Sequence, residues 1–581
     1  MSVSSNIFWF QSCLKVLRFL QSDGRIWEHG GGEEHERRRN RIGGLRFYGI
    51  SAFRTVAVHS LGRSSLPSLI LSSASAAGVQ LCSILHCARI GTWMRQLPAR
   101  RGGIRKQGSS TTQKSAAVKH VLCLSNGHGE DSIAVSVLAQ LMALADENGE
   151  EIVVEALPLV GLGSAYSHAG IPVLGPCKNM PSGGFLYMDI LNLVGDIRAG
   201  LVFLTLGQWR TILRWMDENP DAFIVAVGDV FPLTLAWLAS LHARRKRKKR
   251  NSFGYAFVGT AKSEFYIDGE DALSSKQVKR FHVASVFFRG GVYLPWERFM
   301  MADNYCRLIA PRDGLTSEML TKHLPSTAQS KVRNLGNPMM CALRPDGTLE
   351  FLKHYAPGRF IALLPGSRAP EVYSNWRILL EASECVTSSL SPNKVVFLTP
   401  VVPSLQPGHF YDQLLDAGWQ PQRLDGEPLV SRDYSQVEEC ERKQMESWPA
   451  HSGTSILRFA KSNAILLLLR GGFSDAGHWA EAGIAMAGTG TEQLVGLGKP
   501  VFTIPGRGPQ FTYAFAEAQA RLLGKSIFLS SDCESLAVKV REVLSNKEFL
   551  AEIAENGLKR MGTAGGARRI AEHVLISFPQ N

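Results

Sequence analysis

Short apolar runs that end in glycine-bearing turns, each followed by a helix-length segment, constrain this 581-residue chain most strongly. The first run, Lys119 to Leu124, leads through a polar glycine turn into a helical pattern that continues to Leu144. Strand, glycine turn and helix in this order open a βαβ unit. Further strands are predicted at 152–157, 222–227, 252–258 and 305–309. This alternation predicts a parallel sheet with helices on both faces.

A second series of strands is predicted at 360–364, 395–399, 465–469, 484–487 and 501–504. Gly336–Asn337–Pro338 lies between the two series and suits a hinge, because proline restricts the residue before it. We therefore predict an α/β protein of two doubly wound Rossmann-like domains, 116–340 and 341–581, facing an interdomain cleft. Residues from about 408 to 455 contain several prolines among charged residues and are predicted to be a surface insertion of the second domain.

The basic charge is concentrated at the start of the chain. Residues 1–115 hold 17 Lys and Arg against 5 Asp and Glu, a net +12 of the chain's +13. No acidic residue occurs from Arg37 to Gly129, while Arg and Ser recur, as in an organelle transit peptide. We expect a disordered targeting leader at 1–115, the alternative being a tail without an address. The rest of the chain is nearly neutral, so no nucleic-acid partner is expected.

The ten cysteines are scattered, with no C-x-x-C pair and no histidine cluster near them. This pattern predicts neither a structural metal nor a disulfide framework, and it suits a reducing compartment. The stretch Leu66 to Cys87 is apolar but interrupted by serine and proline, so no transmembrane segment is expected.

A turn with Gly366, Ser367 and Arg368 follows the first strand of the second series, and Glu371 comes three residues later. Backbone amides in such a turn can approach an anion, and the arginine offers a planar fork to phosphate oxygens. A tight turn with a surface arginine is the alternative.

A stronger signal follows the strand at 484–487 and opens a helix. Its residues are Gly488, Thr489, Gly490, Thr491, Glu492 and Gln493. Helix N-terminal amides and the two threonine hydroxyls are expected to face a diphosphate, and Glu492 to accept from ribose hydroxyls. Downstream, Gln510 and Gln519 are candidates for binding the sugar, because amide side chains both donate and accept. Helix capping and solvation would explain these two glutamines nearly as well.

In the first half, the turn after the first strand carries Asn126, Gly127, His128, Gly129 and Glu130, followed by Asp131. Gly228 and Asp229 end a later strand. Transfer to a hydroxyl needs a base, and Asp229 and His128 are the candidates. A helix-capping aspartate and a turn histidine are the alternative interpretations.

These motifs resemble those of the lipid-A-disaccharide synthase family, and more closely its related proteins from cyanobacteria and plants. The resemblance covers roughly Lys119 to the C-terminus. It is carried by Leu364–Arg368 with Glu371, Ala487–Glu492, Leu294–Pro295–Trp296–Glu297 and Gly336–Asn337–Pro338.

The resemblance implies a GT-B fold, an inverting transfer from a UDP-sugar, no cofactor, and peripheral attachment to a membrane that holds a lipid acceptor. The cyanobacterial likeness favours the plastid over the mitochondrion as destination. Near Asp229 the chain has one aspartate where the family pattern has two, which favours a different acceptor. A nucleotide-sugar epimerase or hydrolase, and a silent nucleotide-sugar-binding protein, are the alternatives.

Overall fold

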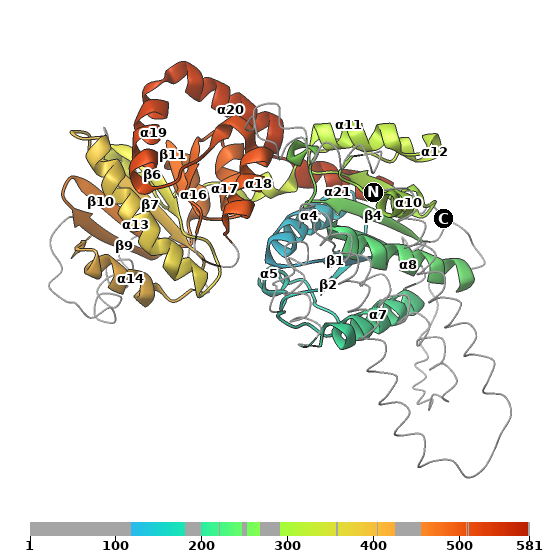
Figure 1. Cartoon of the computed structure of the whole chain (residues 1–581). Helices are drawn as coiled ribbons and strands as arrows, with labels where there is room; N and C mark the ends of the chain where they lie inside the picture. The colour runs from blue at the N-terminus through green and yellow to red at the C-terminus, as the bar shows by residue number, and fades with distance from the viewer. Residues whose placement is uncertain are drawn as a thin grey trace, which may run out of the picture. The chain divides into compact units, whose positions relative to one another are not determined.

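The computed structural model describes residues 118–180, 198, 200–219, 221–246, 253–267, 291–355, 358–403, 405–423, 455–506, 508 and 511–578. The predicted leader 1–115 lies outside the described residues. The described chain forms two sheets, each covered by helices (Figure 1).

The first sheet has five strands in the order β2-β1-β3-β4-β5, all parallel. Its strands are β1 (Lys119–Ser125), β2 (Ile152–Pro158), β3 (Ala222–Gly228), β4 (Gly254–Gly259) and β5 (Cys306–Ala310). The helices of this part of the chain are α4 (His128–Glu147), α5 (Ser164–His168), α7 (Leu201–Glu218), α8 (Val230–Lys246), η3 (Glu264–Tyr266), α10 (Pro295–Ala302), α11 (Gly314–His323), α12 (Ser326–Gln329) and η4 (Pro338–Ala342).

Successive side chains of a strand point to opposite faces of the sheet, and both faces of this sheet are apolar, so helices cover both. On β1, Val121 and Cys123 belong to the apolar cluster that includes α4, whereas Leu122 and Leu124 belong to the cluster that includes α7 and α8. All four side chains are fully buried. A strand buried on both faces reads as a continuous apolar run, which is the signal in the sequence.

The second sheet has eight strands in the order β13-β12-β11-β6-β7-β10-β9-β8. Its strands are β6 (Arg359–Leu364), β7 (Val395–Val401), β8 (Gln420–Gln422), β9 (Ser455–Lys461), β10 (Ala464–Arg470), β11 (Ala482–Ala485), β12 (Val501–Thr503) and β13 (Ile527–Leu529). The helices of this part are η5 (Glu350–Tyr355), α13 (Glu371–Ser389), α14 (Pro407–Asp416), α16 (Phe473–Trp479), α17 (Thr489–Gly496), α18 (Tyr513–Leu523), η6 (Gly524–Ser526), α19 (Cys533–Ser545) and α20 (Lys547–Met561).

Six strands of this sheet are parallel and follow the strand order of dinucleotide-binding folds, with β6 first, β7 and β10 on one side, and β11 to β13 on the other. Strands β8 and β9 extend the sheet in antiparallel pairing. Each strand predicted from the sequence is present. Together the two sheets confirm the predicted fold class, two doubly wound Rossmann-like domains of the GT-B type.

The predicted insertion at about 408–455 is wrong for its first part. Residues of α14 and β8 lie within it, and Phe410, Tyr411 and Leu414 are fully buried against α13 and the sheet. The prolines and charged residues made the segment look polar as a whole. The apolar residues of α14 are nevertheless spaced so that they form one buried face of a helix. The middle of the predicted insertion, 424–454, lies outside the described residues.

The last helix, α21 (Gly566–Ile576), packs on the first domain although it follows the second in sequence. In Figure 1 this red helix lies beside α4 and β4. Ile570, Ala571 and Val574 are buried in the same cluster as Val121, and Phe578 stacks on Phe223 with ring centroids 4.9 Å apart. The predicted second domain, 341–581, therefore does not include this helix.

Among the described helices, none has both the length and the apolar character needed to cross a membrane.

Candidate functional site

The glycine turn after β6 and the glycine turn after β11 lie side by side in the second domain. The two strands are parallel neighbours, and the Met486 amide donates to the Leu364 carbonyl at 2.8 Å. Strand order reverses at this pair, which is where doubly wound sheets bind ligands. Gly366 has φ +107°, and a Cβ there would lie 3.2 Å from the Met486 carbonyl oxygen. Glycine is therefore required for the turns to approach each other.

The turn after β11 presents the N-terminus of α17 without a side-chain cap. The backbone carbonyls of this turn accept hydrogen bonds from side chains of the same domain. The Thr491 hydroxyl donates to the Ala487 carbonyl at 2.7 Å, and the Gln519 amide donates to the Ala487 and Gly488 carbonyls at 3.2 and 3.1 Å. The turn is thereby held with helix amides, rather than carbonyls, open to an anion.

Several residues predicted to contact the donor instead support this turn. Thr491 is fully buried, so the expectation that its hydroxyl faces a diphosphate is wrong, whereas Thr489 is exposed. Gln519 is 3% exposed and holds the turn rather than facing an open site. The Gln493 amide donates to the Met339 carbonyl at 3.1 Å. Gln510 lies outside the described residues.

Arg368 and Glu371 follow the turn at Gly366. Arg368 is partly buried, and burial lowers its pKa while the Glu130 and Glu371 carboxyl groups raise it. Glu371 is 8% exposed and accepts from the Phe511 amide at 2.7 Å. Glu371 thus anchors the loop before α18, and Arg368 is the cation of this edge.

In the first domain, the predicted residues meet where β1 and β3 end, again at the point where strand order reverses. The Asn126 amide donates to one Asp229 oxygen at 3.0 Å. The other Asp229 oxygen accepts from the Phe231 amide at 2.8 Å, which caps α8. Asp229 is only 7% exposed. The capping interpretation of Asp229 is therefore confirmed.

Glu130 lies beside Asp229. Gly228 has φ +126°, and a Cβ there would lie 3.2 Å from the Glu130 Cγ. Burial, with smaller contributions from Asp229 and Asp131, raises the pKa of Glu130 to about 7, and a backbone hydrogen bond and Arg368 of the second domain act against this rise. A carboxyl group that titrates near neutrality is suited to proton transfer.

Beneath the turn, Asp131 is fully buried in a polar network. It accepts from the Ser125 hydroxyl at 2.6 Å, and Ser125 in turn lies 2.6 Å from the Tyr166 hydroxyl. Burial raises the pKa of Asp131 to about 7, with the Ser125 hydrogen bond opposing. This network holds the start of α4 against β1.

Glycine turns of the two domains come close together. A Cβ on Gly129 would lie 3.6 Å from the Thr489 hydroxyl oxygen. The α4 helix begins after Gly127, at φ +120°, and like α17 it has no side-chain cap. Two uncapped helix N-termini thus approach one another, with Arg368 near Glu130. His128 is the first residue of α4, and its side chain is not among those described.

Arg312, which follows β5, is a residue that the sequence reasoning missed. It is 3% exposed and donates to the Glu492 carboxylate at 2.7 Å and to the Thr260 carbonyl at 3.2 Å. Burial acts to lower its pKa, but Glu492, Tyr266 and Asp313 together outweigh burial and raise it. Glu492, expected to bind ribose, is thus already paired with the first domain. The sequence around Arg312 does not indicate that it pairs with Glu492, because the two residues are 180 positions apart.

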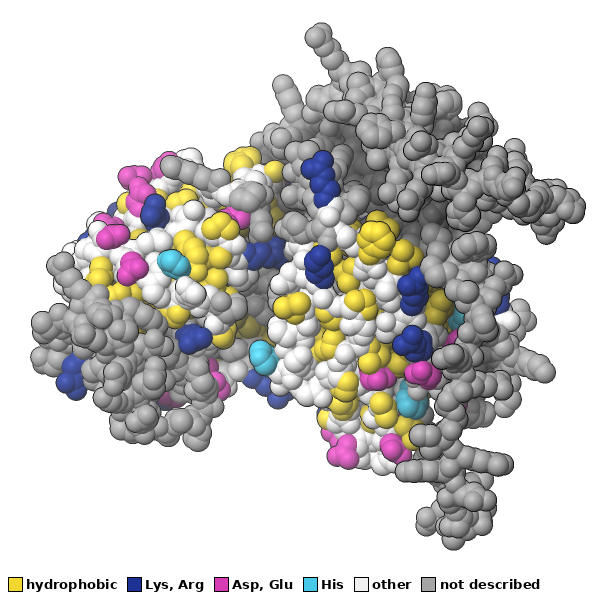
Figure 2. All heavy atoms as spheres, turned by 90° about the horizontal axis from the view of Figure 1, so that it is seen from below, with side chains coloured by type: hydrophobic (Ala, Val, Ile, Leu, Met, Phe, Trp, Pro, Cys, Tyr) yellow, Lys and Arg dark blue, Asp and Glu magenta, His cyan; other side chains and the backbone are white. Residues whose placement is uncertain are grey.

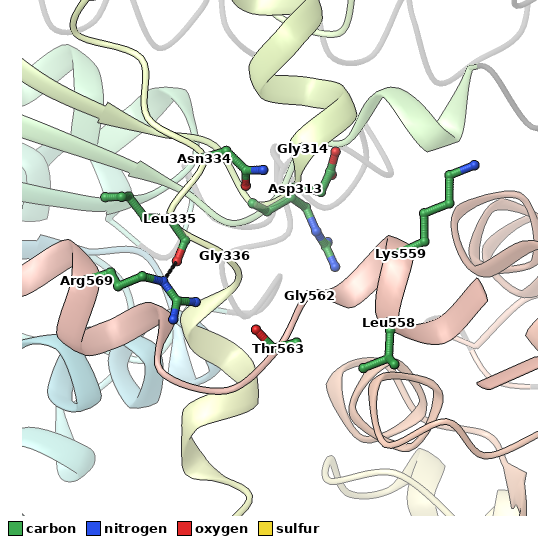
Figure 3. Close-up of a pocket in the computed structure, with 11 residues that line it drawn as sticks. Asp313, Gly314, Asn334, Leu335, Gly336, Leu558, Lys559, Gly562, Thr563 and Arg569 are labelled. Carbon is green, nitrogen blue, oxygen red and sulfur yellow. Dashed lines mark hydrogen bonds between the residues drawn. The ribbon is translucent and has the colours of Figure 1, made fainter. Parts of the chain in front are cut away.

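A separate pocket of about 310 Å³ lies between the loops before α11 and before α21 (Figure 3). The Arg569 guanidinium donates to the Leu335 carbonyl at 2.8 Å on one side of it, as the dashed line shows. Gly336 of the predicted hinge and Thr563 also line it. None of the residues predicted to bind donor or acceptor lines this pocket.

No protein-family model matches the chain, and no curated protein matches it. Solved structures do align with it. A putative UDP-N-acetylglucosamine 2-epimerase from Listeria monocytogenes is 13% identical, with 78% of this chain and 95% of that chain covered and a TM-score of 0.43. The UDP-GlcNAc 2-epimerase of Neisseria meningitidis, bound to UDP-GlcNAc, is 13% identical, with 79% and 99% covered and a TM-score of 0.41. MurG of Acinetobacter baumannii is 11% identical, with 79% and 99% covered and a TM-score of 0.39.

Proposed function

We propose that the protein is a glycosyltransferase that moves a sugar from a UDP-sugar to a hydroxyl acceptor with inversion at the anomeric carbon. The observation that carries this proposal is the approach of the uncapped N-termini of α4 and α17, with Arg368 close to Glu130.

A diphosphate suits this arrangement on physical grounds. The N-terminus of a helix carries partial positive charge and unpaired amides, and both favour an anion. Arg368 adds a full positive charge and a planar fork for phosphate oxygens. The Gly366 and Gly488 turns allow the backbone to come close to the ligand. The choice of uridine follows the family resemblance.

The carboxyl groups at the ends of β1 and β3 supply the other half of the reaction. Asp229 and Glu130 lie together, and Arg368 links Glu130 electrostatically to the diphosphate edge. An acceptor hydroxyl that enters from the first domain would then meet the anomeric carbon on the side opposite the diphosphate. Attack from that side inverts the configuration, and a carboxylate there can take the proton.

A nucleotide-sugar 2-epimerase is the second candidate, and the titrating carboxyl group of Glu130 favours it. Epimerisation moves protons to and from the sugar itself, and a carboxyl group with a pKa of about 7 can both accept and donate near neutrality. A binding protein without activity is the third candidate. It needs the diphosphate edge but no proton-transferring group.

One experiment separates the three functions. The protein is incubated with UDP-GlcNAc, UDP-glucose or UDP-galactose, with and without a lipid extract, and free UDP and sugar configuration are followed by NMR. A transferase releases UDP in proportion to added acceptor. An epimerase converts the sugar without needing an acceptor. Binding of UDP-sugar with neither change indicates the silent protein, and the absence of any UDP-sugar binding contradicts all three.

We also propose that the acceptor is a lipid and that the face carrying α7 contacts its membrane. Phe203 on α7 is 81% exposed and Phe299 on α10 is 65% exposed. Arg210 and Arg214 follow Phe203 at helical spacing on the same side of α7. Figure 2 shows yellow hydrophobic side chains interspersed with dark blue Lys and Arg over this part of the first domain. Exposed aromatic residues among cations suit an anionic lipid surface.

Flotation with phosphatidylglycerol vesicles measures this contact. Binding to the vesicles should weaken in Phe203→Ser. It should persist in the control Leu558→Ser, which removes an exposed leucine of α20.

A further inference from the structure

We propose that Glu130 is the residue that takes the proton of the acceptor hydroxyl. This inference rests on the proposed transferase function and assigns the proton acceptor within it.

The hydrogen bonds of Asp229 argue against it as the base. One carboxylate oxygen caps α8 through the Phe231 amide, and the other is held by the Asn126 amide. Each bond stabilises the ionised form and removes a lone pair from the approaching hydroxyl. The side chain is 7% exposed, so little of it can meet a substrate. Asp229 is therefore held at the end of β3 by a hydrogen bond to each of its two carboxyl oxygens.

Glu130 has the opposite properties. It lies one residue past Gly129, on the first turn of α4, and is only partly buried. Its Cγ lies next to Gly228, where a Cβ in place of the glycine hydrogen would be 3.2 Å from it. Arg368 lowers the pKa of Glu130, so the positive charge at the diphosphate edge acts on this carboxyl group. An acceptor hydroxyl that attacks a sugar held at that edge passes this position.

The charged groups around Glu130 set its proton affinity. Asp131 faces it from α4, Asp229 from the end of β3, and Arg368 from the turn after β6. Burial and the two carboxylates raise the pKa of Glu130 to about 7, and Arg368 acts against them. A bound diphosphate adds negative charge nearby and neutralises Arg368, so it raises the pKa of Glu130 further.

The acceptor O–H bond breaks and its proton goes to a Glu130 carboxylate oxygen. The acceptor oxygen bonds to the anomeric carbon as the bond from that carbon to the β-phosphate oxygen breaks. The electron pair leaves with UDP, where Arg368 and the helix N-termini hold the negative charge. Glu130 returns its proton to solvent after UDP departs.

The first test needs no acceptor. The diphosphate of UDP-GlcNAc keeps its charge between pH 6 and pH 8, so a change in affinity reports on the protein. Ionised Glu130 repels the diphosphate and competes for Arg368, so calorimetry should show wild-type affinity falling about five- to tenfold across this range. In Glu130→Gln most of this pH dependence should be lost. Asp131→Asn and His128→Gln, which remove the neighbouring titratable groups, should keep most of the slope. A wild-type slope in Glu130→Gln overturns the proposal.

The second test measures turnover at saturating donor by release of UDP. Glu130→Gln should lower kcat by about 10²- to 10⁴-fold with donor affinity retained, and Asp229→Asn should lower it less. The wild-type rate should rise with pH through a midpoint above 7 and lose that limb in Glu130→Gln. Formate should partly restore Glu130→Ala, because a small carboxylate can replace the missing base. A larger loss of kcat in Asp229→Asn than in Glu130→Gln, or no effect of formate, assigns the proton to another group.

A wild-type protein that binds UDP-GlcNAc but releases no UDP contradicts the proposed function instead. In that case the pH dependence of the affinity still reports which group titrates.

Discussion

Arg368 carries the sharpest prediction at the scale of single residues. It is the cation beside the uncapped end of α17, so Arg368→Ala should weaken UDP-sugar binding by about 1.5–3 kcal/mol, the contribution of charge-assisted hydrogen bonds. Calorimetry measures the loss. Arg359 provides the matched control, because it lies at the opposite end of β6 and pairs with Glu481 at 2.6 Å. Arg359→Ala should leave the affinity unchanged, and equal loss in both variants would remove Arg368 from the site.

Asp131 gives a prediction about stability and pH. Its pKa is raised by burial from 3.8 to about 7, so the folded protein keeps this proton over a range in which the unfolded chain has released it. Stability therefore falls as pH rises through that range, and the full cost is present above pH 7.

Asp131→Asn cannot ionise, so its free energy of unfolding relative to wild type should improve between pH 5 and pH 8. Because Asp131 also raises the pKa of Glu130, both proteins in this comparison carry Glu130→Gln, so that Glu130 does not contribute to the difference. Denaturant titrations at the two pH values measure the difference. Asp146→Asn, on the exposed side of the same helix, is the control for the loss of a carboxyl group from α4. A constant difference between wild type and Asp131→Asn would mean that the buried carboxyl group keeps an ordinary pKa.

At the scale of elements, α21 shows how sequence position and structural role separate. It follows the second domain, yet its buried face completes the helical layer against α4 and β1. The exposed ion pair between Arg568 and Glu147 joins the same two helices at 2.8 Å. Such an exposed pair adds little to stability, so the apolar face carries the attachment.

Ile570→Ala should therefore lower the free energy of unfolding of the first domain by about 2–5 kcal/mol, because Ile570 is only 1% exposed. Ile576→Ala on the same helix is the control, since that side chain is 75% exposed. Hydrogen exchange of the β1 amides should report the change in the first variant alone. Unchanged protection of β1 in Ile570→Ala would mean that α21 contributes no stability to that sheet.

For the whole molecule, the leader provides the prediction. Within the described part of the chain, the first residue paired in a sheet is Lys119, opposite Ile152, so a chain that begins at Ala116 should fold and keep UDP-sugar binding. Thermal melting and calorimetry compare it with the full chain.

We also propose that the leader directs the protein to the plastid. A fluorescent reporter fused to residues 1–115 should accumulate there, and delivery to mitochondria would favour the other reading of the same Arg- and Ser-rich composition.

The strands and glycine turns could be predicted from the sequence because their signals are local. A strand buried on both faces must be apolar along its length, and a turn at φ +107° such as Gly366 must be glycine. The same reasoning located the turns after β1, β3, β6 and β11. Because parallel strands end at one edge of a sheet, these turns were expected to share a site, and within each domain they lie together.

Contacts between distant segments could not be predicted in this way. Arg312 and Glu492 are 180 positions apart, and nothing near either residue indicates the other. The same limit applies to α21, whose amphipathic pattern predicts a buried face but not which sheet it covers. The antiparallel strands β8 and β9 were not predicted, because a long polar segment separates them in the sequence and gives no sign that they pair.

Glu130 shows this division most clearly. Its sequence neighbours placed it in a candidate turn, but proton affinity depends on burial and on charges that the fold brings near it. Asp229 approaches it from a strand about a hundred residues away, and Arg368 from the other domain. Residue type and spacing therefore predict which turns form the site. The roles within it depend on the three-dimensional arrangement of charge, which exists only once both sheets have formed.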